Sequence, residues 1–119
     1  MDNNHVKITT MKEVKAIVKP FKVNDILNQL LEAGYPNVTV SMAEGTGNFK
    51  SDESTISTHF SITDSQVAQI EIVCIDSDVE KVVNIISSFA RTGNPGDGII
   101  YVSNVENLFK VKTGNNVEL

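Results

Sequence analysis

The first half of the chain alternates between apolar and polar positions and then changes period. Residues 13–18 are Glu-Val-Lys-Ala-Ile-Val, a period of two that predicts a half-buried strand. Pro20 ends this strand, because proline has no N–H to give to the ladder. Asn24 is then predicted to cap a helix that ends at Gly34, and residues 37–44 alternate again as a second strand. The core-facing positions of this helix are Val23, Ile26, Leu27, Leu30 and Leu31.

The second half of the chain repeats this plan. Residues 70–75 are rich in β-branched side chains and predict a strand. A capping-box pattern at residues 77–80, with serine first and glutamate last, predicts the start of a second helix. Residues 99–105 predict another strand, and residues 108–112 either extend it or form a short further one. The order predicts an α+β fold, a ferredoxin-like split βαβ sandwich (βαββαβ) in which one antiparallel sheet carries two helices on one face.

Composition and charge narrow the class of protein. The chain has 119 residues, 40% of them hydrophobic, which suits one domain with one core. A net charge of −5 makes nucleic acid a poor partner. No apolar run approaches the roughly 20 residues that cross a bilayer, so membrane insertion is not expected. Residues 1–10 lack the apolar segment of a secretion signal, and the single cysteine, Cys74, favours a reducing, cytoplasmic setting.

The stretch between the two halves, residues 46–66, has a different composition. Nine of its 21 residues are serine or threonine, and its apolar residues follow no helical period. Such a segment is either a disordered spacer or a mobile recognition loop on a rigid scaffold, and we favour the loop. Alternatively, the second half of this stretch is not loop, and Phe60 and Ile62 instead continue the neighbouring strand toward Ile70. The candidate anchors for a protein partner are Phe49, Ile56, Phe60 and Ile62.

The strongest local signal for chemistry is residues 92–98, Thr-Gly-Asn-Pro-Gly-Asp-Gly. Three glycines around a proline let backbone N–H groups turn toward one point, as in an anion-binding nest, although a tight turn also explains them. Lys110 and Lys112 alternate on the strand that is predicted to follow. They either supply positive charge to a phosphate or keep a strand edge soluble.

Other candidate motifs are weak. Gly-Thr-Gly at residues 45–47 permits the close approach of a flat ligand, or only a bend, and residues 19–22 suggest packing and a polar turn. His5 and His59 are far from Cys74 along the chain, so a nucleophile with its base is not expected. Cys74 lies in an apolar run and is predicted to be a small core residue. Neither a catalytic centre nor a metal site is therefore predicted.

Together these segments resemble the PII family of nitrogen-regulatory signalling proteins over residues 11–114. The resemblance rests on Ala-Ile-Val-Lys-Pro-Phe-Lys at residues 16–22 and on the glycines at residues 45–47. Its most specific part is Arg-Thr-Gly-Asn-Pro-Gly-Asp-Gly at residues 91–98, followed by Lys-Val-Lys-Thr-Gly at residues 110–114. These motifs in combination make chance a poor explanation.

The resemblance implies a domain organisation. Residues 11–114 form one PII-like domain, a ferredoxin-like subunit of a homotrimer. The long polar stretch, at about 46–66, is its T-loop, and about 91–98 is its B-loop. Residues 1–10 are then an N-terminal extension, and residues 115–119 are a C-terminal tail.

The resemblance also implies a ligand. ATP or ADP is expected in the clefts between adjacent subunits as a regulatory ligand, with no prosthetic group and no protein-held metal, while the part played by Mg²⁺ is left open. The residues that match the family's nucleotide-binding positions are Ile17, Thr39, Gly45, Thr46, Gly47, Val73, Arg91, Thr92, Gly96, Asp97, Gly98, Lys110 and Lys112.

The chain departs from the family pattern at several positions. Asn48, Phe49 and Ile99 stand where the family carries arginine, glutamine and lysine. Gln66 and Val67 stand where the family has a lysine that binds 2-oxoglutarate, and lysine replaces arginine at two phosphate-binding positions. We therefore expect adenine-nucleotide binding that tolerates ADP, without the usual 2-oxoglutarate response.

The function that the resemblance implies is regulation. Nucleotide occupancy would bias the T-loop, which would bind or release a target, and the cytoplasmic face of a membrane transporter is the first candidate. One alternative is a PII-like sensor of another ligand, such as AMP with bicarbonate, a cyclic nucleotide or a metal. The other is a small phosphohydrolase, for which Arg91 is the one arginine available. We do not expect an enzyme.

Overall fold

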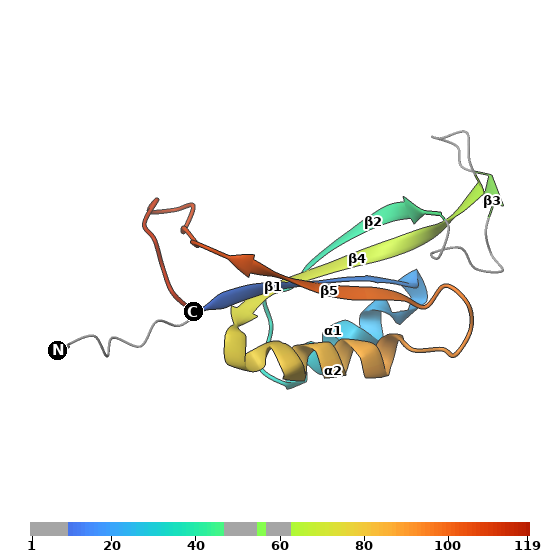
Figure 1. Ribbon diagram of the computed structural model, residues 1–119, viewed down its shortest axis with the longest axis horizontal. Coiled ribbons are helices and arrows are strands. Elements are labelled where there is room, and N and C mark those ends of the chain that lie inside the picture. Colours follow the sequence, from blue (N-terminus) through green and yellow to red (C-terminus); the bar gives the residue numbers. More distant parts are fainter. Residues whose placement is uncertain (1–9, 47–54, 57–62) are drawn as a thin grey trace.

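The structure is a computed structural model that describes residues 10–46, 55–56 and 63–119. Its main sheet has four antiparallel strands in the order β2-β4-β1-β5, and both α-helices cover the same face of this sheet (Figure 1). A short strand, β3 (Thr55–Ile56), pairs with the first residues of β4. The ferredoxin-like sandwich predicted from the sequence is confirmed.

The strands follow the alternation in the sequence, with one difference in length. β4 was predicted from residue 70, but it begins seven residues earlier, so that residues 63–66 of the expected loop are strand. At one end of the sheet, Val18, the last residue of β1, lies opposite Gly98, the first residue of β5. The main strands are β1 (Met11–Val18), β2 (Thr39–Gly45), β4 (Thr63–Ile75) and β5 (Gly98–Val105).

Each helix begins differently from the prediction. A 3₁₀ turn precedes each helix, and the N–H of the first helical residue, Val23 or Val79, donates to a carbonyl of that turn. In the described chain, no side-chain cap hydrogen bond is found at either helix start. The predicted Asn24 cap and the capping box at residues 77–80 are therefore wrong. Gly34, with φ 96°, ends the first helix as predicted. The elements are η1 (Pro20–Lys22), α1 (Val23–Glu32), η3 (Asp76–Asp78) and α2 (Val79–Ala90).

The core lies between the sheet and the two helices. Of the helical stripe predicted for α1, Ile26 and Leu30 are fully buried, whereas Leu31 is 59% exposed. Cys74 is buried in this core, as expected of a small apolar residue. The core residues are Val14, Ala16, Val18, Ile26, Leu30, Ala68, Ile70, Ile72, Cys74, Val82, Ile86 and Ala90.

The segment after β5 is not the strand predicted for residues 108–112. Phe109 makes an isolated bridge to Asn116, and the chain between them turns back on itself. The Gly114 N–H donates to the Lys110 carbonyl at 2.7 Å, which closes the turn. Lys110 and Lys112 therefore do not alternate along a strand but belong to this C-terminal turn.

Candidate functional site

The glycine-rich segment forms a loop between α2 and β5, at one end of the sheet (Figure 1). α2 ends at Ala90, and the extended backbone of Arg91 (φ −67°, ψ 130°) takes the chain out of the helix. The loop, residues 91–98, then returns to the sheet at Gly98. Its two ends are thus set by elements that pack on the same core.

Gly98 fixes the end of this loop against β1. A Cβ at this position would lie 1.7 Å from the carbonyl oxygen of Ile17 and 2.8 Å from its carbonyl carbon. The φ of Gly98 is 112°, a conformation that other residues rarely adopt. Both the space and the backbone conformation therefore require glycine.

Asp97 organises the loop from within. Its Oδ2 accepts hydrogen bonds from the N–H groups of Thr92 and Gly93, both at 2.9 Å, and its Oδ1 accepts from the Thr92 hydroxyl. The Asn94 N–H donates in turn to Thr92 Oγ1 at 3.0 Å. The Thr92 hydroxyl, followed by the two backbone donors, holds the pKa of the Asp97 carboxyl well below its ordinary value of 3.8. The carboxylate is thus ionised at neutral pH.

Lys19, one residue beyond β1, reaches the same carboxylate. Its Nζ lies 3.4 Å from Asp97 Oδ1 and donates to Thr92 Oγ1 at 3.3 Å. Residues 19–22 were interpreted as packing and a polar turn, so this contact was not predicted. It depends on the pairing of Val18 with Gly98, a long-range register that local sequence does not specify. The Lys-Pro at the end of the first strand was the available signal.

Acid is expected to remove the contribution of Asp97 to stability. Its folded pKa lies below the unfolded value, so the stabilisation is present above pH 3.8 and is lost as the pH falls toward the folded pKa. We expect Asp97→Asn to lower the free energy of unfolding at about pH 6, and the difference from the unmodified chain to narrow by about pH 3. Urea denaturation at each pH measures this difference. A difference that is the same at both pH values would contradict the role given to the carboxylate.

The tip of the loop presents a backbone donor. Pro95 and Gly96 form a turn, and the φ of 84° at Gly96 is typical of the third residue of a type II turn. None of the hydrogen bonds found among the described residues uses the Gly96 N–H. The internal bonds of Asp97 thus leave this donor available to an anion.

A cavity of about 310 Å³ opens beside the loop. At its rim the Arg91 Nη2 donates to the Ser87 hydroxyl at 2.9 Å, which keeps a cation next to the cavity. Ile99 adds an apolar surface there, and its partner in the register is Ile17 on β1. The lining residues are Val18, Ser87, Ala90, Arg91, Asp97, Gly98, Ile99 and Ile100.

The loop and Ile17 lie together, but other predicted nucleotide-binding residues lie farther away. Thr39 pairs with Glu71 and Val73 with Glu13, which places both along the sheet away from the loop. Of the Gly-Thr-Gly segment at residues 45–47, Gly45 is the last residue of β2 and lies opposite Ser65 on β4. Thr46 follows it directly, and Gly47 lies outside the described residues.

The C-terminal turn, to which the two predicted lysines belong, lies at the opposite end of the sheet from the loop (Figure 1). β5 connects the loop to the C-terminal turn, and its eight residues span about 26 Å. Lys110 and Lys112 in one chain therefore do not meet the loop of the same chain.

Three of the four predicted partner-binding residues, Phe49, Phe60 and Ile62, lie outside the described residues, as do His5 and His59. Ile56 belongs to β3. In the described chain, no group of three or more possible metal ligands occurs, and no helix is long and apolar enough to cross a bilayer.

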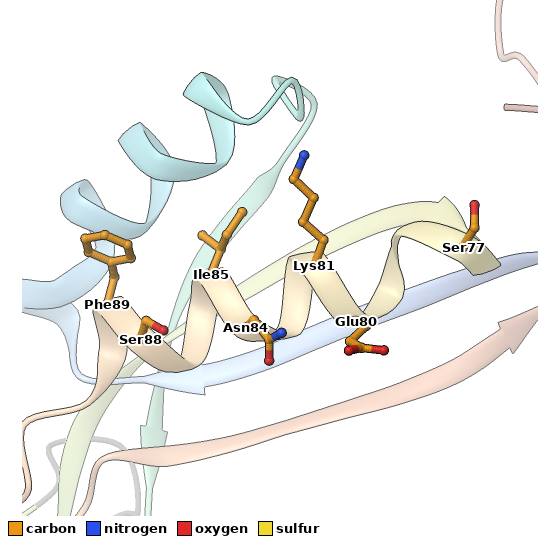
Figure 2. A pocket seen from close by; sticks show the side chains of 7 residues that line it. All are labelled: Ser77, Glu80, Lys81, Asn84, Ile85, Ser88 and Phe89. Carbon is orange, nitrogen blue, oxygen red and sulfur yellow. The ribbon is translucent and has the colours of Figure 1, made fainter.

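A second hollow, of about 550 Å³, lies along the outer surface of α2 (Figure 2). Lys81, Ile85 and Phe89 point to one side of the helix, and Glu80 and Asn84 to the other. The Lys81 Nζ lies 5.7 Å from the centre of the Tyr35 ring. The residues that line this hollow come from α2 and the turn before it, and none was predicted to bind a ligand. Its residues are Ser77, Glu80, Lys81, Asn84, Ile85, Ser88 and Phe89.

Comparisons with known proteins agree on one family. The family model described as Nitrogen regulatory protein P-II matches residues 11–115. Proteins of that name from Rhizobium meliloti and Nostoc punctiforme are 36% and 38% identical over 105 residues, which cover 87% of this chain and 94% of each relative. The crystal structure of Arabidopsis thaliana PII bound to citrate matches with a TM-score of 0.74 and 32% identity, covering 96% of this chain and 92% of that one.

Proposed function

Because this chain belongs to the PII family of nitrogen-regulatory signalling proteins, we propose that it binds ATP or ADP and regulates a protein target accordingly. The members of this family are signalling regulators. We propose further that the protein acts in the cytoplasm and that the bound nucleotide determines whether the target is bound.

The observation that supports nucleotide binding is the anchored loop at residues 91–98. Its internal acceptor, Asp97, accepts from the N–H groups of Thr92 and Gly93 and also lines the cavity, while the N–H of the preceding residue, Gly96, remains available at the tip of the loop. A loop that is shaped before the ligand arrives loses little conformational entropy on binding. A phosphate oxygen is suited to accept a hydrogen bond from the Gly96 N–H.

A homotrimer is part of this proposal, since PII proteins are homotrimeric regulators. Lys110 and Lys112 are too far from the loop of their own chain, because β5 separates them. In a trimer, a neighbouring subunit would bring its C-terminal turn to the loop and add two positive charges to a phosphate-binding cleft. The nucleotide would then lie between two subunits.

We also propose that 2-oxoglutarate has no effect on this binding. Val67 stands where the resemblance places a lysine that binds the oxo-acid, and its side chain is 5% exposed on β4. A buried apolar side chain offers no positive charge to a carboxylate. The exposed Gln66 beside it is neutral.

The target would be bound through the residues between β2 and β4. Phe49, Ile56, Phe60 and Ile62 are the proposed anchors, and the cytoplasmic face of a membrane transporter is the proposed partner. The bound nucleotide can change target binding only if ATP and ADP favour different conformations of this segment.

Titration calorimetry of the full chain tests the ligand. We expect ATP and ADP each to bind with micromolar dissociation constants, and 2-oxoglutarate, with or without Mg²⁺, to leave these constants unchanged. A tightening by 2-oxoglutarate would contradict the proposed insensitivity. Absence of nucleotide binding would instead favour a PII protein that senses another small ligand.

Two substitutions are expected to weaken nucleotide binding without changing the oligomer. Asp97→Ala removes the acceptor that shapes the loop, and Lys110→Ala removes a charge from the neighbouring subunit's side of the cleft. Each is expected to raise the dissociation constant of ATP about tenfold, as the loss of a charge-assisted bond does. Calorimetry measures affinity and light scattering the oligomer, with Lys81→Ala on α2 as the matched lysine control. Unchanged affinity in both variants would refute the site.

A further inference from the structure

We infer that Lys19 is a positioning residue for the loop at residues 91–98. In this inference Lys19 holds the loop in the shape that accepts an anion and cancels the charge of Asp97, without touching the anion itself. It rests on the proposed nucleotide site and adds to it a residue from another part of the sheet.

One ammonium group joins both ends of the loop to β1. Thr92 is the second residue of the loop and Asp97 the last but one, and the Lys19 Nζ lies 3.3 Å from the hydroxyl of the first and 3.4 Å from a carboxylate oxygen of the second. Lysine has three donors, which suits a bridge between two acceptors. The loop ends are thus held by one side chain from outside the loop.

The backbone gives this side chain a fixed origin. Lys19 follows Val18, the last residue of β1, and precedes Pro20, which begins η1. A residue before proline is restricted to extended conformations, and Lys19 has φ −66° and ψ 135°. The ammonium is therefore directed from a backbone that is fixed at the end of β1.

The burial of the Lys19 side chain favours a positioning role over direct contact with the ligand. The Lys19 side chain is 11% exposed, whereas that of Asp97 is 28% exposed. With two of its three donors directed at Thr92 and Asp97 and little of its side chain exposed, the ammonium offers little surface to a ligand. If the ammonium turned away from Asp97, the carboxylate would remain uncompensated beside the arriving anion, which Coulomb repulsion disfavours.

The charges around the loop support the same role. Of the ion pairs found in the described chain, the one that involves Asp97 is with Lys19. The other nearby cation, Arg91, donates to the neutral Ser87 hydroxyl instead. Lys19 thus neutralises the carboxylate and leaves Arg91 as the positive charge that faces the cavity.

The first experiment uses the full chain without ligand. Lys19→Met removes the ammonium and keeps the length of the side chain, and Lys22→Met is the control, because the Lys22 Nζ lies over the Phe21 ring instead. We expect Lys19→Met to speed hydrogen exchange of the Thr92 and Gly93 amides about fivefold, since the loop opens more often. Lys22→Met should leave the exchange of both amides unchanged.

A pH titration of the Asp97 carboxyl by NMR gives a second readout. In Lys19→Met its pKa should rise but stay below the ordinary value of 3.8, because the Thr92 and Gly93 donors remain in place. The control should keep the pKa of the unmodified chain. An unchanged pKa together with unchanged exchange in Lys19→Met would overturn the inference.

The second experiment measures ATP and ADP affinity of the same variants by calorimetry. Lys19→Met is expected to weaken both about tenfold, and Lys22→Met to leave both unchanged. Lost affinity with normal exchange and a normal Asp97 pKa would make Lys19 a direct ligand and overturn the inference. If the unmodified chain binds neither nucleotide, the proposed function fails, while exchange and pKa still decide whether Lys19 holds the loop.

One measurement needs no variant, so it can test the inference even if Lys19→Met does not fold. The ammonium resonance of Lys19 in the unmodified chain reports on its surroundings. Because the inference keeps this group on Asp97 and Thr92 in both states, ATP should leave its chemical shift nearly unchanged. A large shift on saturation with ATP would show direct contact and overturn the inference.

Discussion

Gly98→Ala is expected to lower the free energy of unfolding by about 3 kcal/mol, because a clash and a strained backbone combine at one position. The new Cβ would meet the carbonyl oxygen of Ile17 at 1.7 Å, and this oxygen belongs to β1, one of the two inner strands of the sheet. Relief requires β1 and β5 to separate at Val18, which would also displace the loop. Urea denaturation at one fixed chain concentration measures the change, since the stability of an oligomer depends on concentration.

Gly93→Ala is the matched control in the same loop. Its φ of 83° imposes a similar backbone strain, but an added Cβ would meet no atom of the described residues within 4 Å. We expect a loss of about 1 kcal/mol, the cost of a left-handed conformation for alanine. The difference between the two variants therefore isolates the clash with β1. Equal losses would show that Gly98 is needed for its conformation alone.

Leu30→Ala is expected to lower the free energy of unfolding by about 3 kcal/mol through the cavity that it leaves in the core. Leu30 is fully buried between α1 and the sheet. Its neighbour Leu31 is 59% exposed in the same helix, so Leu31→Ala should cost less than about 1 kcal/mol. Both changes have the same effect on helix propensity, so denaturation of the pair compares burial directly. Similar losses of unfolding free energy in the two variants would show that Leu31 is buried in a contact outside this core.

The two anchors of the loop differ in what they control. Gly98 sets where the loop joins the sheet, and its replacement is expected to act mainly on stability. Lys19 and Asp97 set the internal shape and charge of the loop, and their replacement is expected to lower affinity in addition to the stability that the Asp97 carboxylate contributes. Stability and nucleotide affinity measured on the same variants therefore separate the scaffold from the site.

The sequence by itself determined the type and order of the main elements. Alternation in β1 and the helical spacing around Leu30 are local patterns, and burial of one apolar face enforces both. The glycine-rich loop and its family were also recognisable, since Gly98 and Asp97 belong to a contiguous motif.

Only the tertiary structure decided the helix starts, the lysine turn and the contact of Lys19 with Asp97. The predicted cap at Asn24 was replaced by a 3₁₀ turn that brings α1 onto the sheet. Lys110 left its predicted strand because the chain turns back on itself after β5. Lys19 reaches Asp97 because the register of β1 and β5 places Val18 opposite the end of the loop. Such a register depends on side chains that are about 80 residues apart in sequence, and no local pattern contains it.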